Sequence, residues 1–442
     1  MNRLIPLLAA FALGATAAFV GERLTRADVA AAARIIGLDF EDAEIDSLLP
    51  NLEQRLEDFE ELRTHEFPNE LMPALVFHPF PRDFAWPEAK GKPEWGPAPE
   101  VRLPDDPDAL AFYSVRELSE LIRTRQITSE ALTRFFLDRL KRYDDTLHFV
   151  VTLTEERALA AARRADAELA QGIWRGPLHG IPYGAKDLFA ASGYPTTWGA
   201  MPYKDQVIDR DAAVIRRLDE AGAVLCAKLT LGALAWGDVW FGGRTRNPWA
   251  PEEGSSGSSA GSASAVAAGC LPFALGTETL GSIVSPSTVC GTTGLRPTFG
   301  RVSRDGAMAL SWSMDKIGPI CRSAEDCALV FSVLHGRDPA DPATYEAPFT
   351  YDATRPLAGM RVGYEAAMRE RDYPFRPYDS LALETLRHLG VELVPITLPE
   401  LPPIRFILET EAAAAFDELT RSNRDTLLVR QIRNAWPNVF RA

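Results

Sequence analysis

Short apolar runs alternate with amphipathic helical segments in the part of the chain that follows Ser114. The spacing of apolar residues predicts helices over 155–170, 212–221, 324–334 and 417–441, and two helices before them, of which the second is capped by Thr128. Apolar runs of strand length occupy 223–227 and 360–364. Such alternation is typical of chains in which the strands form one sheet and the helices cover it. We therefore expect an α/β fold, an α/β/α sandwich with a mixed central sheet.

Two segments of different character precede this region. From Arg26 to Arg63 the apolar residues recur with helical spacing, and Gly37 separates two predicted helices. Ten prolines then fall between Phe67 and Phe112, where they cannot donate the hydrogen bonds of regular structure. Aromatic side chains in this second segment predict that it lies against the main domain. The expected division is a helical extension over 21–66, a proline-rich strap or linker over 67–112, and the main domain over 113–442.

The first 20 residues have the pattern of a targeting segment. Arg3 precedes an apolar run over 4–20, and the small residues 15–17 suit a cleavage site. A bilayer span needs about 20 apolar residues, so an uncleaved anchor is the alternative. We interpret residues 1–20 as a signal peptide, with the mature protein beginning near Ala18, and expect export to the periplasm or the medium.

The charge of the chain excludes one class of partner. The formal net charge is −14, with 46% hydrophobic and 24% charged residues, which is the composition of an ordinary globular protein without a basic stripe. Phosphate backbones are bound by clustered lysine and arginine. We therefore expect a small-molecule substrate and no direct nucleic-acid partner.

Neither the cysteines nor the histidines have the spacing of metal ligands. The five cysteines lie in apolar surroundings without a CxxC or CxH pattern, which favours buried free thiols. The six histidines form no HExxH or related pattern, and no dinucleotide-binding or P-loop glycine pattern occurs. We expect no metal and no cofactor.

Lys186 ends the apolar stretch GIPYGAK, which predicts a buried side chain. Burial disfavours the charged ammonium and lowers the pKa of a lysine, so that its neutral amine can act as a base near neutral pH. The alternatives are a lysine that reaches solvent from a strand end, or one that pairs with the adjacent carboxylate of Asp187.

Ser258 and Ser259 lie in a glycine- and serine-rich stretch that runs into ASAVAAG, a helix-compatible segment. A flexible linker would not lead directly into a buried helix. The stretch GSSAG also satisfies the G-x-S-x-G pattern, which would make Ser259 the nucleophile of an α/β-hydrolase. That pattern requires a buried strand immediately upstream, and residues 247–256 are polar and interrupted by proline. We therefore disfavour the α/β-hydrolase interpretation.

Ser282 follows the turn Thr279-Leu280-Gly281 in the stretch GTETLGSIVSP. If Ser282 is a nucleophile, the backbone N–H groups of these three residues are the predicted oxyanion hole. The alternative is a glycine turn between a strand and an element that starts at Pro286.

The stretches around Lys186, Ser258 and Ser282, in this order, resemble the motifs of the amidase signature family of serine hydrolases. The resemblance runs from about Tyr113 to the C-terminus. It implies that Ser282 attacks an amide carbonyl, that Ser258 relays the proton, and that Lys186 is the base. It also implies a cis peptide bond at Ser258. Three further residues match the downstream framework of the family and are expected to be scaffold residues: Arg296, Asp315 and Arg322.

Three positions depart from the family pattern. Many members have two glycines before the nucleophile and an arginine two residues after it, whereas this chain has Leu280-Gly281 and Val284. A leucine in the turn restricts its backbone angles and fills part of the pocket mouth, which leaves the substrate open. Glu278 replaces a common aspartate, which is a milder change.

The main hypothesis is an exported amidase that hydrolyses a carboxamide or small peptide amide. One alternative is the glutamine-hydrolysing A subunit of an Asp/Glu-tRNA amidotransferase, to which the resemblance also extends. The other is an inactive fragment, because family members continue considerably further beyond the nucleophile, so that the C-terminal part of the domain is expected to be missing. A homo-oligomer stays open, and no dedicated protein partner is expected.

Overall fold

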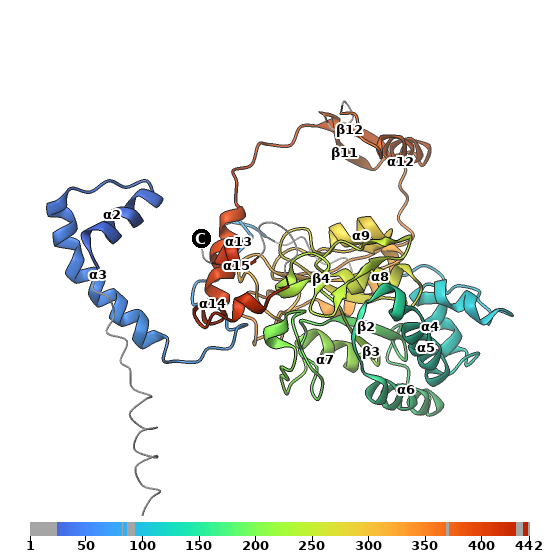
Figure 1. Cartoon of the computed structure of the whole chain (residues 1–442). Helices are drawn as coiled ribbons and strands as arrows, with labels where there is room; N and C mark the ends of the chain where they lie inside the picture. Colours follow the sequence, from blue (N-terminus) through green and yellow to red (C-terminus); the bar gives the residue numbers. More distant parts are fainter. Residues whose placement is uncertain (1–23, 82, 86–92, 368–370, 430–435, 441–442) are drawn as a thin grey trace, which may run out of the picture. The chain divides into compact units, whose positions relative to one another are not determined.

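A computed structural model describes residues 24–81, 83–85, 93–367, 371–429 and 436–440 (Figure 1). The chain divides into two compact units, Met1–Pro68 and Asn69–Ala442. Residues 1–20, on which the predicted signal peptide depends, lie outside the described residues.

The first unit contains the two helices that the sequence predicts, α2 (Arg26–Ile35) and α3 (Asp42–Leu62). Thr25 caps α2, because its side chain accepts from the backbone N–H of Asp28 while the Asp28 carboxylate accepts from Thr25. Gly37, with a φ of 73°, lies in the connection, where glycine adopts a positive φ without steric cost. Arg26 forms an ion pair with Asp46 across the two helices.

A six-stranded mixed sheet forms the centre of the second unit, in the order β1-β3-β2-β8-β10-β9. Strands β3, β2 and β8 are parallel to one another, while β1, β10 and β9 pair in the antiparallel sense. The strands are β1 (Val150–Leu153), β2 (Pro182–Lys186), β3 (Val224–Leu229), β8 (Ala274–Glu278), β9 (Thr293–Gly294) and β10 (Lys316–Cys321).

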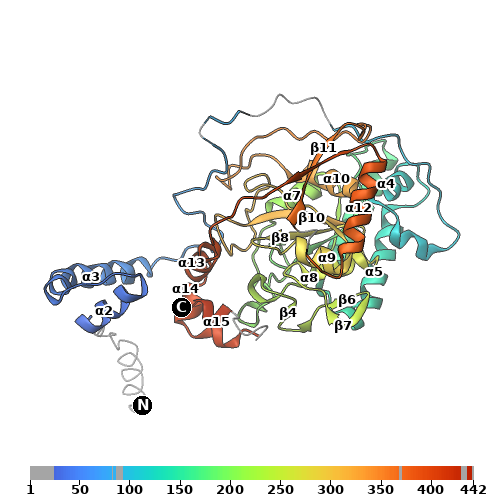
Figure 2. The ribbon, with the colours of Figure 1, turned by 90° about the horizontal axis from the view of Figure 1, so that it is seen from above.

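Helices pack against this sheet and complete the predicted α/β class. Helix α8 packs on the central strands β2, β8 and β10, α6 and α7 pack on β3, and α10 packs on β10. Figures 1 and 2 both show α9 beside α8. The α-helices of this region are α4 (Val115–Arg123), α5 (Ser129–Leu147), α6 (Glu155–Ala170), α7 (Ala213–Glu220), α8 (Ala260–Ala267), α9 (Val284–Cys290) and α10 (Ala324–Leu334). Thr128 caps α5 as predicted, since its side chain accepts from the backbone N–H of Ala131.

Short elements connect the larger ones. They are the 3₁₀ turns η1 (Pro107–Phe112), η2 (Met201–Tyr203), η3 (Ala233–Ala235) and η4 (Arg424–Leu427), and the two-stranded ribbons β4 (Val239–Trp240) with β5 (Gly243–Arg244) and β6 (Arg246–Asn247) with β7 (Ala250–Gly254). Strand β7 lies in the segment that the sequence indicated to be irregular. It is largely exposed and pairs only with β6, so it is not the buried strand that a nucleophile elbow requires.

The last part of the chain contains a parallel strand pair and a helical end. Strands β11 (Arg361–Glu365) and β12 (Glu392–Ile396) flank α12 (Arg376–His388). The end is made of α13 (Arg405–Ala415), α14 (Asp417–Arg421), η4 and α15 (Trp436–Phe440). The helical stretch predicted over 417–441 is therefore divided, because Asn423 has a positive φ of 61° and ends the α14 turn.

Aromatic side chains of the proline-rich segment pack against later parts of the second unit, as predicted. The Phe77 ring meets Phe299 at 5.5 Å between centroids, and the Phe80 ring meets Tyr345 at 4.5 Å. Among the described residues of this segment, Glu94 forms an isolated β-bridge with Asp352, and the expectation of no regular structure is wrong at the end of the segment, where η1 forms. Pro107 starts this turn at a position whose N–H needs no partner.

Candidate active site

Lys186 is the last residue of β2, a strand enclosed by β3 and β8 in the middle of the sheet. Its side chain is completely buried. The amine nitrogen lies 2.8 Å from Ser258 Oγ, 2.8 Å from Thr277 Oγ1 and 3.1 Å from Ser259 Oγ. The carboxyl ends of parallel strands are where open α/β sheets place their ligand sites, and β2 and β8 deliver Lys186 and Thr277 to that edge.

The surroundings of Lys186 favour its neutral form. Burial lowers the pKa of Lys186 from 10.5 to about 7, and the more distant carboxylates of Asp315 and Glu278 oppose this only in part. The neighbours within hydrogen-bond distance are neutral hydroxyl and carbonyl groups. A neutral amine in this position can accept the proton of the Ser258 hydroxyl.

The neighbouring carboxylate of Asp187 has a different partner from the one that the sequence allowed. Its Oδ1 lies 2.7 Å from the amine of Lys228, and both side chains are fully buried. The other carboxylate oxygen, Oδ2, accepts from the backbone N–H of Thr197 at 2.9 Å. The carboxylate that is adjacent to Lys186 in sequence therefore pairs with Lys228 and does not hold the Lys186 ammonium in its charged form.

Ser258 and Ser259 lie directly before helix α8, and Ser259 is the N-cap residue of that helix. The peptide bond between Gly257 and Ser258 is cis. Gly257 admits no side chain, because a Cβ atom there would lie 1.8 Å from the carbonyl oxygen of Gly237. Ser259 is fully buried, and its hydroxyl donates to the carbonyl of Thr277 at 3.1 Å. Ser259 is thus held against β8, away from solvent, which argues against the α/β-hydrolase interpretation.

Ser282 lies in the turn between β8 and α9, next to the Ser258 segment. The backbone N–H of Ser259 donates to the Ser282 carbonyl at 3.1 Å. Ser282 is half-buried and lines a cavity together with Gly257 and Leu280. The fold therefore brings the three residues Lys186, Ser258 and Ser282 to one edge of the sheet, with Ser282 as the member that lines the cavity.

Glu278 shapes the turn that carries Ser282. Its Oε2 accepts from the backbone N–H groups of Ile283 at 2.8 Å and Val284 at 2.9 Å, and Arg296 lies 3.1 Å from Oε1. Burial raises the pKa of Glu278, but these backbone donors, that of Gly281 and the Arg296 side chain outweigh it and leave the pKa below its usual value. The glutamate caps the first turn of α9, a role that the sequence analysis did not assign.

The predicted oxyanion residues differ in their surroundings. Thr279 is buried and Leu280 is 56% exposed, and both line the Ser282 cavity. Gly281 has a φ of 88°, a conformation that favours glycine. The Thr279 hydroxyl donates to Asp315 Oδ1 at 2.5 Å. The assignment of these three residues to an oxyanion hole stays a prediction.

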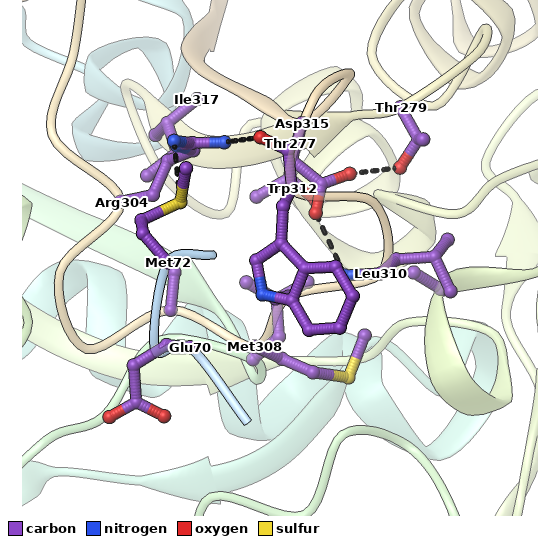
Figure 3. A pocket seen from close by; sticks show the side chains of 14 residues that line it. Glu70, Met72, Thr277, Thr279, Arg304, Met308, Leu310, Trp312, Asp315 and Ile317 are labelled. Atoms are coloured by element: carbon purple, nitrogen blue, oxygen red, sulfur yellow. Dashed lines mark hydrogen bonds between the residues drawn. The ribbon is translucent and has the colours of Figure 1, made fainter. Parts of the chain in front are cut away.

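A second cavity adjoins the first and is shown in Figure 3. The two cavities share three lining residues: Ala235, Thr279 and Leu310. We call the second cavity the apolar pocket, because most of its side chains are hydrophobic; they are Met72, Leu188, Ala235, Ala307, Met308, Ala309, Leu310, Trp312 and Ile317. The apolar pocket therefore shares one wall with the cavity that Ser282 lines.

Sequence reasoning assigned Asp315 only to the scaffold and missed the loop before β4. Asp315 Oδ2 accepts from the backbone N–H groups of Leu310 at 2.8 Å and Ser311 at 2.9 Å. Because its Oδ1 accepts from the Thr279 hydroxyl, Asp315 connects the loop that lines the apolar pocket to Thr279. Leu234 and Ala235 both have a positive φ, 50° and 59°, which is uncommon for residues with a side chain. A loop with positive φ angles at Leu234 and Ala235 has no periodic sequence pattern by which it could be predicted. Asp315, in contrast, could be identified in the sequence from the motif before β10.

The other scaffold predictions and the cysteines agree with the geometry. Arg322 donates to the carbonyl groups of Leu271 at 2.9 Å and Tyr113 at 2.8 Å. All five cysteines are buried free thiols. Within the described ranges, the acidic, histidine and cysteine side chains form no group of three or more that could hold a metal ion.

Solved structures of similar proteins share this fold. The peptide amidase of Stenotrophomonas maltophilia matches with a TM-score of 0.62 and 34% sequence identity, over 71% of this chain and 69% of that one. The A subunit of glutamyl-tRNA(Gln) amidotransferase from Thermotoga maritima matches with a TM-score of 0.60 and 26% identity, over 74% of this chain and 72% of that one.

Curated relatives include A subunits of glutamyl-tRNA(Gln) amidotransferase. The protein of Dechloromonas aromatica is 40% identical over 295 residues, which are 65% of this chain and 61% of the relative. That of Moorella thermoacetica is 41% identical over 58% of this chain and 53% of the relative. The chain thus spans between half and two thirds of the length of these relatives.

The prediction of export is wrong by this comparison. The matched relatives belong to a tRNA-dependent enzyme, which is cytoplasmic machinery, whereas the prediction depended on a composition pattern in residues 1–20. Among the helices in the described ranges, none combines the length and the apolar character needed to cross a membrane.

A family model described as Amidase matches residues 131–441. This range contains all three residues of the candidate triad, and it covers more than half of the chain. The chain therefore belongs to the amidase family.

Proposed function

We propose that this protein is a serine amidase that hydrolyses a carboxamide or a small peptide amide. Ser282 attacks the carbonyl carbon, and its proton passes through the Ser258 hydroxyl to the neutral amine of Lys186. The protonated Lys186 then returns a proton to the leaving nitrogen as the C–N bond breaks. Water next hydrolyses the acyl-enzyme, with Lys186 again acting as the base.

The observation that carries the proposal is the environment of Lys186. The pKa of this buried lysine is lowered to about 7, and its nitrogen lies 2.8 Å from Ser258 Oγ. A general base works best with a pKa near the working pH, and base catalysis typically contributes about 10²–10⁴-fold. A lysine that served only a structural role would gain from a carboxylate partner, which here is bound to Lys228 instead.

The oxyanion of the tetrahedral intermediate would be stabilised by backbone N–H groups of the turn Thr279-Leu280-Gly281. Loss of one such donor typically costs about 10²–10³-fold in kcat. The hydrogen bond from Thr279 to Asp315 supports this proposal, because it fixes one end of the turn. The backbone contacts of Glu278 fix the other end.

The second candidate function is glutamine hydrolysis as the A subunit of a tRNA-dependent amidotransferase. It is favoured by the curated relatives, which carry that name. Such a protein would release ammonia from glutamine and would depend on partner subunits. The two candidates share the triad and differ in the acyl group.

Ammonia release by the purified chain distinguishes the two candidates. The substrates are simple aliphatic amides, peptide amides and glutamine, each with the wild-type chain and with Ser282→Ala. Turnover of aliphatic or peptide amides by the chain alone supports the amidase proposal. Turnover restricted to glutamine, and seen only with partner subunits of an amidotransferase, supports the second candidate. Equal turnover by the Ser282→Ala chain would contradict the mechanism for both.

A further inference from the structure

Two consecutive residues, at the point where β10 begins, contact Thr279 in the turn before Ser282. The Asp315 carboxylate accepts from the Thr279 hydroxyl, as Figure 3 shows, and the amine of Lys316 donates to the Thr279 carbonyl at 3.0 Å. Strand pairing explains this arrangement, because Lys316 lies opposite Glu278, the last residue of β8, in the antiparallel register of β8 and β10. The Asp315 contact therefore fixes the side chain of Thr279, and the Lys316 contact fixes its backbone.

Ion pairing does not explain why a lysine occupies position 316. The Lys316 side chain is half-buried, and burial lowers its pKa from the ordinary value of 10.5, while the carboxylates of Asp315 and Glu278 oppose this from beyond hydrogen-bond distance. In the part of the chain that the structure describes, Lys316 forms no ion pair, and its amine donates to the Thr279 carbonyl. Withdrawing a charged group from water costs free energy unless polar contacts compensate it. The contact with the Thr279 carbonyl is thus the feature of Lys316 that needs a function.

This contact sets the direction of the next backbone N–H group. The peptide bond between Thr279 and Leu280 is trans, and in a trans peptide unit the C=O and N–H bonds point in opposite directions. Because the carbonyl is turned toward Lys316, the Leu280 N–H points away from the lysine. Thr279 and Leu280 both line the Ser282 cavity, whereas Lys316 does not.

The N–H group of Leu280 is free to bind a ligand. Within the described ranges it donates to no acceptor of the protein. The N–H groups of Gly281, Ile283 and Val284 differ, because all three act on the Glu278 carboxylate. An oxyanion hole requires donors that are fixed in direction before the oxyanion forms. Of these four residues, Leu280 is the one whose backbone donor is left for that purpose.

We propose that Lys316 is a positioning residue of the oxyanion hole: it holds the Thr279 carbonyl and thereby directs the Leu280 N–H toward the oxyanion that forms on the substrate. This inference rests on the proposed amidase function. A charged donor on the carbonyl also polarises the peptide unit, which strengthens the N–H group at its other end as a donor. Lys316 itself does not touch the substrate.

The first test measures kcat and KM for propionamide, with rates expressed per site that a fluorophosphonate labels. Lys316→Met keeps a side chain of similar length and removes the donor. Loss of a whole oxyanion donor typically costs about 10²–10³-fold in kcat. Because Lys316→Met only releases the direction of the Leu280 N–H, kcat should fall by about 10–10²-fold. KM should stay unchanged, since the interaction is made in the transition state and not with the bound amide.

Further variants separate positioning from a structural role. Lys316→Arg retains a charged donor and should recover most of the lost kcat. Lys141→Met is the matched control, since Lys141 is exposed and pairs with Glu155 at the surface; it should leave kcat and KM unchanged. Lys316→Gln, whose amide donor is one bond nearer to the backbone, replaces Lys316→Met if that chain does not fold, and should show the same selective loss of kcat.

Three results would overturn the inference. They are an unchanged kcat in Lys316→Met, a loss of equal size in Lys316→Arg, and a loss of equal size in Lys141→Met.

Calorimetric titration with butylboronic acid separates this inference from the proposed function. The boron atom accepts a lone pair of Ser282 Oγ, the serine proton passes to Lys186, and the resulting tetrahedral boronate anion places an oxygen in the oxyanion hole without turnover. Lys316→Met should weaken this binding by about tenfold or more, and Ser282→Ala should abolish it.

The outcomes of the titration are distinct. If the wild-type chain hydrolyses no amide, yet Lys316→Met weakens boronate binding as expected, the amidase proposal falls and the positioning role of Lys316 stands. Equal affinity of the wild-type and Lys316→Met chains, or no binding to the wild-type chain, would overturn the positioning role, whatever the activity.

Discussion

The amine of Lys186 lies 2.8 Å from the hydroxyl oxygen of Ser258, and neither side chain is more than 1% exposed. The two residues come from a central strand and from the segment before a helix, 72 positions apart. Their contact is isolated from water, which strengthens the coupling between the hydroxyl proton and the charge on the amine. Both the activity and the stability of the chain should therefore respond to the protonation of Lys186.

The activity should rise with pH as Lys186 loses its proton. The pKa of Lys186 is lowered to about 7, so kcat/KM of the wild-type chain should increase through about pH 7 and level off above it. Lys186→Ala should remove most of the activity at neutral pH, with partial recovery at high pH, where hydroxide replaces the base. A flat pH profile of the wild-type chain would exclude Lys186 as the titrating base.

The same shift predicts a pH dependence of stability. The unfolded chain binds a proton at Lys186 up to about pH 10.5, whereas the folded chain releases it near pH 7, so the unfolded state binds more protons between these values. The free energy of unfolding should therefore rise with pH in this window because of Lys186. Lys186→Met removes this dependence. Urea unfolding of both chains at several pH values measures it, and parallel curves would contradict the assigned burial.

Ser282 should be the residue that a fluorophosphonate labels. It lines the cavity, whereas Ser259 is fully buried with its hydroxyl bonded to the Thr277 carbonyl. Ser282→Ala should abolish labelling, and the Ser259→Ala chain should still carry the label on Ser282. Mass spectrometry of the labelled peptide locates the adduct. Labelling of Ser259 in the wild-type chain would revive the nucleophile-elbow interpretation.

Glu278 should stabilise the turn only as a carboxylate. Its pKa lies below the ordinary value of 4.5, so its contribution is fully present above about pH 4.5 and is lost as the pH falls through the lower folded value. Glu278→Ala leaves the N–H groups of Ile283 and Val284 without their acceptor and should lower the free energy of unfolding by about 1–3 kcal/mol. Glu278→Gln retains one acceptor oxygen and should cost less. Equal losses in both variants, measured in urea, would contradict the capping role.

Asp315 should contribute to the stability of the folded chain through its hydrogen bonds, and its negative charge should not be needed for catalysis. Asp315→Ala removes the acceptor of two backbone N–H groups and of the Thr279 hydroxyl, which should cost about 1–3 kcal/mol of folding free energy. Asp315→Asn can keep its carbonyl oxygen on the two N–H groups and its amide on Thr279. It should therefore be nearly as stable as the wild type, and a kcat within about tenfold of the wild-type value would show that the charge itself is dispensable.

The sequence determined the class of fold through local patterns. Apolar spacing located α2, α3, α5, α6 and α10, because a helix or strand that faces a core repeats its apolar residues with its own period. The helix cap at Thr128 could also be predicted, because its side chain accepts from a backbone N–H only three positions away. It failed over 417–441, where a positive φ at Asn423 divides a helical pattern that the side chains alone would continue.

The candidate triad was visible in the sequence because Lys186, Ser258 and Ser282 each lie in a distinctive glycine- or serine-rich stretch, and their order resembles that of a family. The sequence does not reveal whether the carboxylate of Asp187 contacts Lys186 or another lysine. Asp187 follows Lys186 directly, yet it pairs with Lys228. Lys186 is the last residue of β2 and Asp187 is the first residue of the turn after it, so their side chains are not held together although the residues are adjacent in sequence.

Tertiary structure alone decided the two features that give the site its chemistry. The lowered pKa of Lys186 depends on complete burial between β3 and β8, and the wall of the apolar pocket includes Met72, which is distant in sequence from Arg304, the residue that it meets. Burial and long-range contact are properties of the packed chain. The order of the residues specifies which groups are present, whereas packing specifies which of them are desolvated and which of them meet.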